Sequence, residues 1–276
     1  MNITFWGTRG SIASAGSETV GYGGNTSCVQ VTGQDGTCLV LDAGSGARRL
    51  GAALPDDLTR LDIFLTHLHM DHIQGLGFFG PLFKPDLDVH IWGPPSATID
   101  LRARLSRYLS PPLFPVRIRD LPCHPTLHNA PERPVSIGEF EVSAAPILHP
   151  GPTVGYRVRE GDASIAYLPD HEPALGLSTF TQPRWTSGFD LCAGVDVMIH
   201  DGQYSPDERA ERIGWGHSSS VEAAALASSA AAKRLVLFHH DPSHDDATLD
   251  RLVAEAAAAA PAVTVSGAHE GQTLTV

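Results

Sequence analysis

Cysteine is scarce in this chain, and its scarcity argues against a fold held together by disulfides. Four cysteines occur among 276 residues, and no two stand in Cys-x-x-Cys spacing; they are Cys28, Cys38, Cys123 and Cys192. A disulfide framework is typical of much smaller chains, so none is expected in a chain of this size. We therefore expect the four thiols to be reduced and structural.

Basic residues are also few, and they do not form a dense run. The chain has 19 Lys and Arg against 31 Asp and Glu, which gives a formal net charge of −12. Its most basic stretches contain only Arg102, Arg104, Arg107, Arg117 and Arg119. Arginines on a helix face are usually solvated, so a long RNA or DNA is a poor candidate partner. A small phosphate substrate stays compatible with this charge, because bound metal cations would offset part of it locally.

Long hydrophobic runs are missing as well. The sequence has neither a basic-then-apolar leader nor an apolar stretch of the ~20 residues needed to span a bilayer. These absences predict no membrane association and a cytoplasmic location. With 42% hydrophobic residues the chain can bury one substantial core, and α/β proteins of this length are commonly single domains. We expect one α/β domain over residues 1–276.

The most informative stretch has the spacing His-x-His-x-Asp-His. It contains His67, His69, Asp71 and His72, and it follows the apolar run 61–65. That run predicts a buried strand, so the cluster lies at the carboxyl end of a strand, where α/β sheets bind their ligands. The first two histidines can hold one cation while Asp71 and His72 face a second position. Imidazole and carboxylate ligands suit zinc, manganese or iron.

Other acids and histidines follow apolar runs farther along the chain. Asp42 stands at a turn of small residues, where it either orients a ligand histidine or marks a tight turn. Asp170 ends a buried strand, and its two carboxylate oxygens can bridge two cations. His217 precedes a helix that starts with the capping-box pair Ser219 and Glu222, and the free N–H groups of a helix start favour an anion.

Alternation and turn signals predict the remaining elements. Strands are expected at residues 2–6, 26–32, 38–42, 139–145, 164–168, 234–238, 262–265 and 272–275, and helices at residues 97–109, 206–212, 219–233 and 245–260. The glycine-punctuated aromatic loop 75–83 is expected either to pack in the interior or to line a substrate pocket. His124 and His128 lack partner spacing, so we expect them on the surface.

Three further motifs accompany the histidine cluster: Phe5–Ser11 (FWGTRGS), Tyr22–Ser27 (YGGNTS) and Leu41–Gly46 (LDAGSG). Together the four resemble the metallo-β-lactamase-fold hydrolases, and in particular the branch that contains phosphodiesterases and the tRNA 3′-end processing ribonucleases. The similarity runs over nearly the whole chain. It implies an αββα sandwich of two mixed β-sheets flanked by helices.

The resemblance also implies two divalent metal ions, zinc or manganese, with iron as a further choice. One ion would be held by His67, His69, His149 and Asp170, and the other by Asp71, His72, Asp170 and His239. His240 is adjacent to His239, so either histidine could be the ligand. Lactam-cleaving relatives carry a cysteine at the position of Asp170, which disfavours a β-lactamase.

The implied reaction is hydrolysis of a small phosphodiester, such as a cyclic-nucleotide-like compound. A hydroxide bridging the two metals would be the nucleophile, with Asp71 among the catalytic residues. His217 would be the general acid, and Asp201 would hold its other nitrogen. A helix-capping role for His217 is the alternative.

Three other functions stay open. The same metals could hydrolyse a carboxylic ester, lactone or thioester without needing the pair of Asp201 and His217. Processing of tRNA 3′ ends is disfavoured, because the chain has no Gly- and Lys-rich arm, and a non-catalytic ligand sensor is the third alternative.

Arg9 could bind phosphate or form a buried ion pair, and Asn25 and Thr26 match the family without an evident role. The apolar loop 78–83 could join a homodimer interface.

Overall fold

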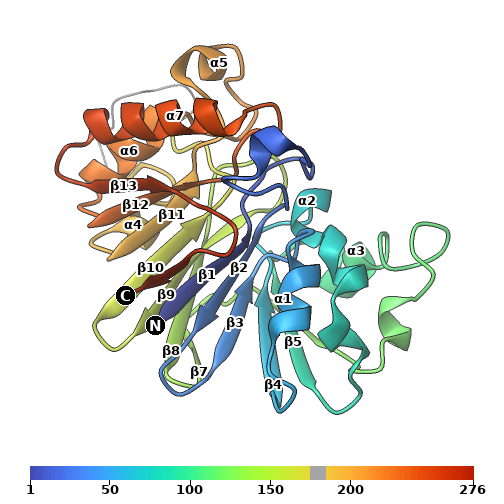
Figure 1. Ribbon diagram of the computed structural model, residues 1–276. Coiled ribbons are helices and arrows are strands. Elements are labelled where there is room, and N and C mark those ends of the chain that lie inside the picture. Colours follow the sequence, from blue (N-terminus) through green and yellow to red (C-terminus); the bar gives the residue numbers. More distant parts are fainter. Residues whose placement is uncertain (175–184) are drawn as a thin grey trace.

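Two β-sheets pack face to face between layers of helices (Figure 1) in the computed structural model, which describes residues 1–174 and 185–276. The predicted αββα sandwich is thereby confirmed. Each sheet has seven strands, with three antiparallel pairings followed by three parallel ones.

The first sheet is built mainly by the N-terminal half of the chain, and the C-terminal strand closes its edge. In spatial order its strands are β14 (Thr273–Thr275), β1 (Asn2–Gly7), β2 (Cys28–Thr32), β3 (Cys38–Leu41), β4 (Arg60–Phe64), β5 (Asp88–Gly93) and β6 (Thr126–Asn129). The central strand β4 is parallel to both neighbours, and Ile63 pairs with Val40 on one side and Ile91 on the other. Parallel strands of this kind are buried on both faces, which explains their unbroken apolar sequence.

The second sheet repeats this plan with the C-terminal half. Its strands are, in spatial order, β13 (Thr264–Gly267), β12 (Arg234–Phe238), β11 (Val197–Asp201), β10 (Ala163–Leu168), β9 (Val154–Glu160), β8 (Phe140–Pro146) and β7 (Val135–Ile137). Strands β10, β11 and β12 run parallel, and β8 points the same way because two antiparallel steps separate it from β10. Their carboxyl ends therefore meet at one edge of the sheet.

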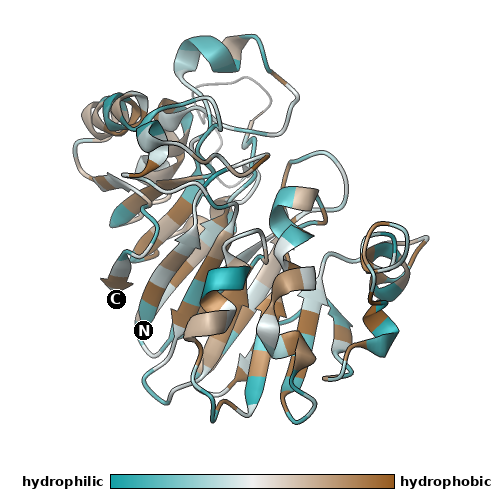
Figure 2. Cartoon of the chain, turned by 45° about the vertical axis from the view of Figure 1, so that its right-hand side comes forward, coloured by the Kyte–Doolittle hydropathy of each residue, from teal (hydrophilic) through white to brown (hydrophobic). Residues whose placement is uncertain are grey.

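Helices cover the outer face of each sheet. They are α1 (Ala47–Ala53), α2 (Met70–Ile73), α3 (Leu101–Leu105), α4 (Phe189–Cys192), α5 (Pro206–Ala210), α6 (Ser220–Ser229) and α7 (Asp246–Ala259), with 3₁₀ turns at Ser17–Thr19, Gln74–Phe78, Gly80–Phe83 and Ile118–Asp120. One apolar cluster fills the space between the sheets, and it includes Phe5, Tyr156 and Phe238. Two more lie between each sheet and its helices. The strands are accordingly rich in hydrophobic residues along their length (Figure 2).

Some predicted elements differ from the observed ones. The helix expected at 97–109 is only α3, because the chain turns after Leu105 and approaches the Pro111-Pro112 pair. The short strands β6 and β7 were not predicted, since their sequences carry no clear alternation. His128, expected on the surface, lies half-buried in β6, where its ring stacks on Trp92 with the centroids 4.1 Å apart.

The four cysteines are buried and unpaired, as predicted. None of the described helices is both long and apolar enough to cross a membrane.

Candidate metal centre

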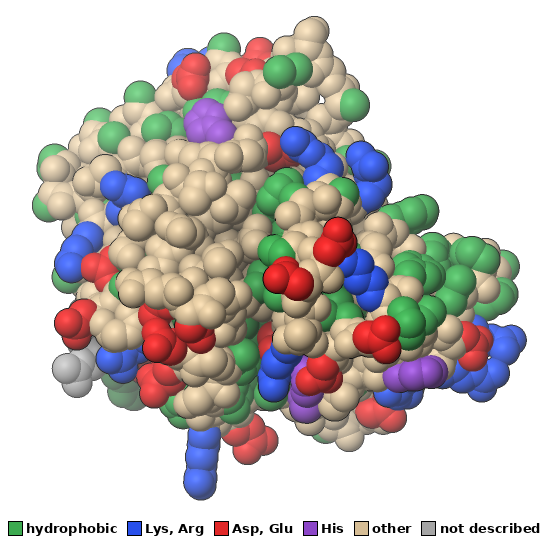
Figure 3. Space-filling view, turned by 60° about the horizontal axis from the view of Figure 1, so that its bottom comes forward, with side chains coloured by type: hydrophobic (Ala, Val, Ile, Leu, Met, Phe, Trp, Pro, Cys, Tyr) green, Lys and Arg blue, Asp and Glu red, His purple; other side chains and the backbone are tan. Residues whose placement is uncertain are grey.

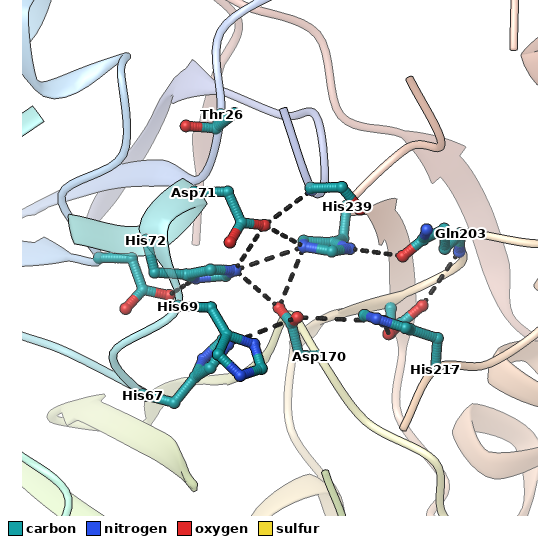
Figure 4. A network of polar contacts seen from close by, with 12 residues as sticks. Thr26, His67, His69, Asp71, His72, Asp170, Gln203, His217 and His239 are labelled. Atoms are coloured by element: carbon teal, nitrogen blue, oxygen red, sulfur yellow. Dashed lines mark hydrogen bonds and ion pairs between the residues drawn. The ribbon is translucent and has the colours of Figure 1, made fainter. Parts of the chain in front are cut away.

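The candidate site lies where the carboxyl ends of strands from both sheets meet. His67 and His69 follow β4, and α2 begins directly after them and carries Asp71 and His72. Asp170 follows β10 by two residues. The loops after β8 and β12 supply His149 and His239. Figure 4 shows His67, His69, Asp71, His72, Asp170 and His239 pointing toward one another.

Asp170 stands at the centre of this cluster, and its two oxygens face different groups. Oδ2 lies 3.7 Å from Nε2 of His67 and 3.7 Å from Nε2 of His149. Oδ1 lies 2.9 Å from Nε2 of His72 and 3.2 Å from Nε2 of His239. One carboxylate thus joins two sets of donors.

Two groups of four side chains converge in this way, and both have the composition expected of a metal site. They are His67, His69, His149 and Asp170, and Asp71, His72, Asp170 and His239. Within each group the candidate ligand atoms lie within 4.8 Å of one another. All seven ligands proposed from the sequence are therefore brought together. A third, overlapping group contains Asp201, His217 and His239.

The protonation of the cluster suits divalent cations. Burial lowers the pKa values of His67, His69 and His149, so these imidazoles are neutral and have a lone pair available. Burial would raise the pKa of Asp170, but the surrounding histidines outweigh it and hold the pKa well below its usual range. An ionised carboxylate among neutral imidazoles is the donor set that zinc, manganese and iron accept.

His67 and His72 support a cation-binding site more directly. Nε2 of His67 is buried and has no hydrogen-bond partner among the described residues, although buried polar atoms are normally paired. Burial would lower the pKa of His72, but Asp170, Asp71 and Asp42 raise it well above its usual value. The carboxylates thus favour a positive charge at the place where a cation would bind, and the donor set fits a metal.

The outward nitrogens of four of these histidines are each held by another group. Nδ1 of His72 lies 2.8 Å from Oδ2 of Asp42, as one of the two readings of Asp42 predicts. For His67, His149 and His239 the partners of Nδ1 are the Thr66 hydroxyl at 3.1 Å, the backbone carbonyl of Gly216 at 2.8 Å and the side-chain oxygen Oε1 of Gln203 at 3.0 Å. Such contacts fix ring orientation and the tautomer in metal sites.

The structure distinguishes the two adjacent histidines at the end of β12. His239 has φ 59°, and this turn of the backbone directs its Nε2 to within 3.1 Å of Asp71 Oδ2. His240 points the other way, and its Nε2 lies 3.1 Å from the Ala268 carbonyl. Gly10 makes room for the His239 ring, because a Cβ at that position would lie 2.3 Å from Nδ1 of His239.

His217 and Asp201 form a pair beside the cluster. Nδ1 of His217 lies 2.7 Å from Oδ2 of Asp201, and the His217 ring stacks on His239 with centroids 5.1 Å apart. Asp201 is itself fixed, because it accepts hydrogen bonds from the backbone N–H groups of His171 and Gln203. Burial would lower the pKa of His217, but the carboxylates of Asp201, Asp170 and Asp71 raise it to about 9.

Glu172 positions the loop that carries His217, and sequence reasoning missed it. Its buried carboxylate accepts hydrogen bonds from the N–H groups of Gly214 at 3.0 Å and Gly216 at 2.9 Å, and it pairs with Arg209 at 2.6 Å. The carbonyl of Gly216 in turn holds His149. Gln203 and Thr66 were also missed, since nothing in their spacing distinguishes them from ordinary polar residues.

The opening motif supports the site from behind. Arg9 is fully buried, donates hydrogen bonds to the carbonyls of Gly23, Asp241 and His244, and has its Nη2 3.9 Å from Oδ1 of Asp246. Its position agrees with the buried ion pair and not with phosphate binding. Asn25 bonds to Glu270. Thr26 accepts hydrogen bonds from the Ser45 backbone and the Gln74 side chain, which ties the segment before β2 to the residue that follows α2.

A pocket of about 300 Å³ opens beside His67 and His69. Its apolar wall contains Leu68, Ile73 and Leu113. The aromatic loop 75–83, one candidate for that wall, does not line it. Phe79 of that loop is buried in the core beneath α1, whereas Phe78 and Phe83 are exposed.

Comparison with known proteins identifies a matching protein family. The family model described as "Beta-lactamase superfamily domain" matches residues 37–240. Ribonuclease BN of Erwinia tasmaniensis is 26% identical over 80% of this chain and 84% of that protein, and ribonuclease Z of Crocosphaera subtropica is 27% identical over 95% and 94%. The crystal structure of the metallo-β-lactamase fold protein YhfI from Bacillus subtilis has a TM-score of 0.72 and 21% identity, covering 99% of this chain and 98% of that one.

Proposed function

Because the chain belongs to the beta-lactamase superfamily, we propose that it is a dinuclear metal-dependent hydrolase acting on a small phosphodiester. The observation that carries this proposal is the position of Asp170 between two sets of ligands, with the pair of His217 and Asp201 beside them. The sequence relatives named ribonuclease support phosphodiester chemistry in particular.

In this proposal the two groups of four ligands each hold one divalent ion. Zinc or manganese is the first choice, and iron the next. Two such ions lower the pKa of water and stabilise the attacking and leaving oxygens of an in-line displacement. The histidine partners described above keep the ligand nitrogens aimed at the site, and the N–H group of Ser11, which donates to Asp71 Oδ2 at 2.7 Å, holds Asp71 in place.

His217 supplies the proton that the leaving alkoxide needs. Its Nδ1 is committed to Asp201, so Nε2 is the nitrogen that can donate. Its pKa of about 9 keeps the ring protonated near neutral pH. Stacking on His239 keeps the ring next to the second set of ligands. Ser219 and Glu222 already cap the helix that follows, so capping does not require His217.

A small substrate suits the charge of the chain better than RNA. The net charge is −12, and basic and acidic side chains are intermixed on the face that Figure 3 shows. Long nucleic acids bind through dense basic surfaces. RNA processing stays a second candidate, because the curated relatives are named ribonuclease Z and ribonuclease BN.

We further propose a cytoplasmic location and a homodimer joined through the exposed Phe78 and Phe83.

The pH dependence of turnover is expected to report the pair of His217 and Asp201. A general acid works while it is protonated, so activity should fall on the alkaline side as the pH rises through the pKa of about 9. Asp201→Asn removes the neighbouring negative charge and lowers that pKa, so the decline should begin at a lower pH. The measurement is kcat against pH for both proteins. An alkaline limb that does not move in Asp201→Asn would contradict the assignment.

Hydrolysis of bis(p-nitrophenyl) phosphate by zinc- or manganese-loaded protein is the direct test of the proposed function. We expect release of p-nitrophenolate that depends on the metal and disappears after chelation. If the loaded protein cleaves p-nitrophenyl acetate or a lactone but not the diester, the ester-hydrolase alternative replaces this proposal.

A further inference from the structure

Two arginines that belong to neither group of metal ligands line the pocket beside His67 and His69. Arg104 and Arg107 line it together with Tyr108 and Leu113. Arg104 belongs to α3, and the N–H of Arg107 bonds to the Arg104 carbonyl at 3.2 Å, so the helical turn continues to Arg107. Residues three apart lie on the same side of such a turn.

Neither guanidinium has a carboxylate partner within the described parts of the chain. Arg104 donates from Nη2 to the carbonyl of Pro94 at 2.5 Å, while its Nε is buried and finds no hydrogen-bond partner in residues 1–174 and 185–276. Arg107 forms no ion pair with any described residue. Arg104 is half-buried, and burial lowers its pKa although the carboxylate of Asp100 acts in the opposite direction. Two guanidinium groups that line one pocket and have no ion-pair partner among the described residues are available to an anion.

The rest of the pocket is apolar. The hydroxyl of Tyr108 donates to the Gln74 carbonyl at 2.6 Å, so what Tyr108 contributes to the pocket is mainly its ring. Leu68, Met70 and Leu113 add aliphatic surface. The pocket therefore combines an apolar body with two guanidinium groups, and one side of it is formed by two of the proposed metal ligands.

We propose that this pocket binds a second phosphate carried by the organic group of the substrate, and that Arg104 and Arg107 select for it. The inference rests on the proposed function, because the scissile phosphate is taken to lie at the metal centre next to the pocket. Guanidinium groups hold phosphate through paired charge-assisted hydrogen bonds. The substrate class is thus a phosphodiester with an apolar or aromatic body and an additional phosphate, not a simple diester.

Two chromogenic substrates that differ by a single phosphate test this proposal. They are thymidine 5′-(p-nitrophenyl phosphate) and the same compound with a 3′-phosphate. For the metal-loaded wild type we expect kcat/KM to be about 10- to 100-fold higher with the 3′-phosphate, mainly through KM. In Arg104→Gln/Arg107→Gln the ratio of the two kcat/KM values should fall toward one. Arg102→Gln is the matched control, because Arg102 is exposed on the same helix and does not line the pocket.

A binding measurement separates this proposal from the proposed function. Thymidine 3′,5′-bisphosphate should bind the wild type more tightly than thymidine 5′-monophosphate in equilibrium dialysis, and the double variant should lose that difference. If neither substrate is cleaved but the binding difference is present, the proposed function fails and the anion pocket stands. If both substrates are cleaved equally, or if the double variant keeps the preference, the pocket proposal is wrong. Arg107→Gln alone, at an exposed position, gives the same test should the double variant not fold.

Discussion

His217→Ala is expected to lower turnover of bis(p-nitrophenyl) phosphate by roughly 10²–10⁴-fold in the metal-loaded protein, which is the usual contribution of a positioned general acid. The reason is geometric. His217 is fixed through Nδ1 by Asp201 at 2.7 Å and lies next to His239, so its Nε2 is free to donate a proton to the leaving oxygen. The metal content should not change, because each of the two groups of four ligands is complete without His217.

Three measurements interpret this variant: kcat, metal content by elemental analysis and the melting temperature. His124→Ala is the matched control, since His124 is exposed and belongs to neither ligand group. Full activity in His217→Ala would contradict the general-acid role and favour an ester, lactone or thioester substrate, whose leaving group needs less help. Loss of metal would instead identify His217 as a ligand, as its place in the third group with Asp201 and His239 allows.

Asp170→Asn is expected to have a still larger effect, because this one carboxylate faces both sets of ligands. Its oxygens lie 2.9 Å from His72 and 3.7 Å from His67, and an amide has one oxygen and no charge to offer two cations. We expect the metal content to fall from about two ions per chain to less than about one. Turnover should fall by roughly 10⁴-fold or more, because the stabilising charge of both ions is lost.

The control for this variant is Asp56→Asn, at a fully exposed carboxylate that pairs with Lys84 on the surface. Metal content, measured after dialysis against zinc and against manganese, separates a loss of binding from a loss of chemistry. A variant that retains two tightly bound ions would show that Asp170 does not bridge them. Circular dichroism of both variants checks that the fold is unchanged.

The sequence predicted much of the site because its central part is local. His67, His69, Asp71 and His72 lie within six residues, and the strand-to-helix turn that carries them is readable from the apolar run before them. The order of strands and helices also followed from alternation and turns, whereas short elements such as β6, β7 and the remainder of the predicted helix 97–109 did not. In such segments contacts with neighbouring strands, not local preference, decide the conformation.

The convergence of distant residues on one site could be expected only by resemblance. His149, Asp170 and His239 are far apart in the chain and follow three different strands. Each alone has the appearance of an ordinary polar residue at a strand end. What brings them together is the parallel direction of β8, β10 and β12, which places all three carboxyl ends at one edge.

By itself, then, the sequence determined the α/β class, the local histidine motif and the types of ligand atom, because these depend on periodicity and residue chemistry, whereas the αββα sandwich was expected from the family resemblance. Only the tertiary structure decided which of His239 and His240 faces the cluster, since that depends on a positive φ angle and on the space left by Gly10. It also decided that Arg9 is buried, that Glu172 holds the His217 loop, and that Arg104 and Arg107 share a pocket with His67. These relations join residues that are distant in sequence, and no local pattern encodes the direction in which a side chain meets a partner from another part of the chain.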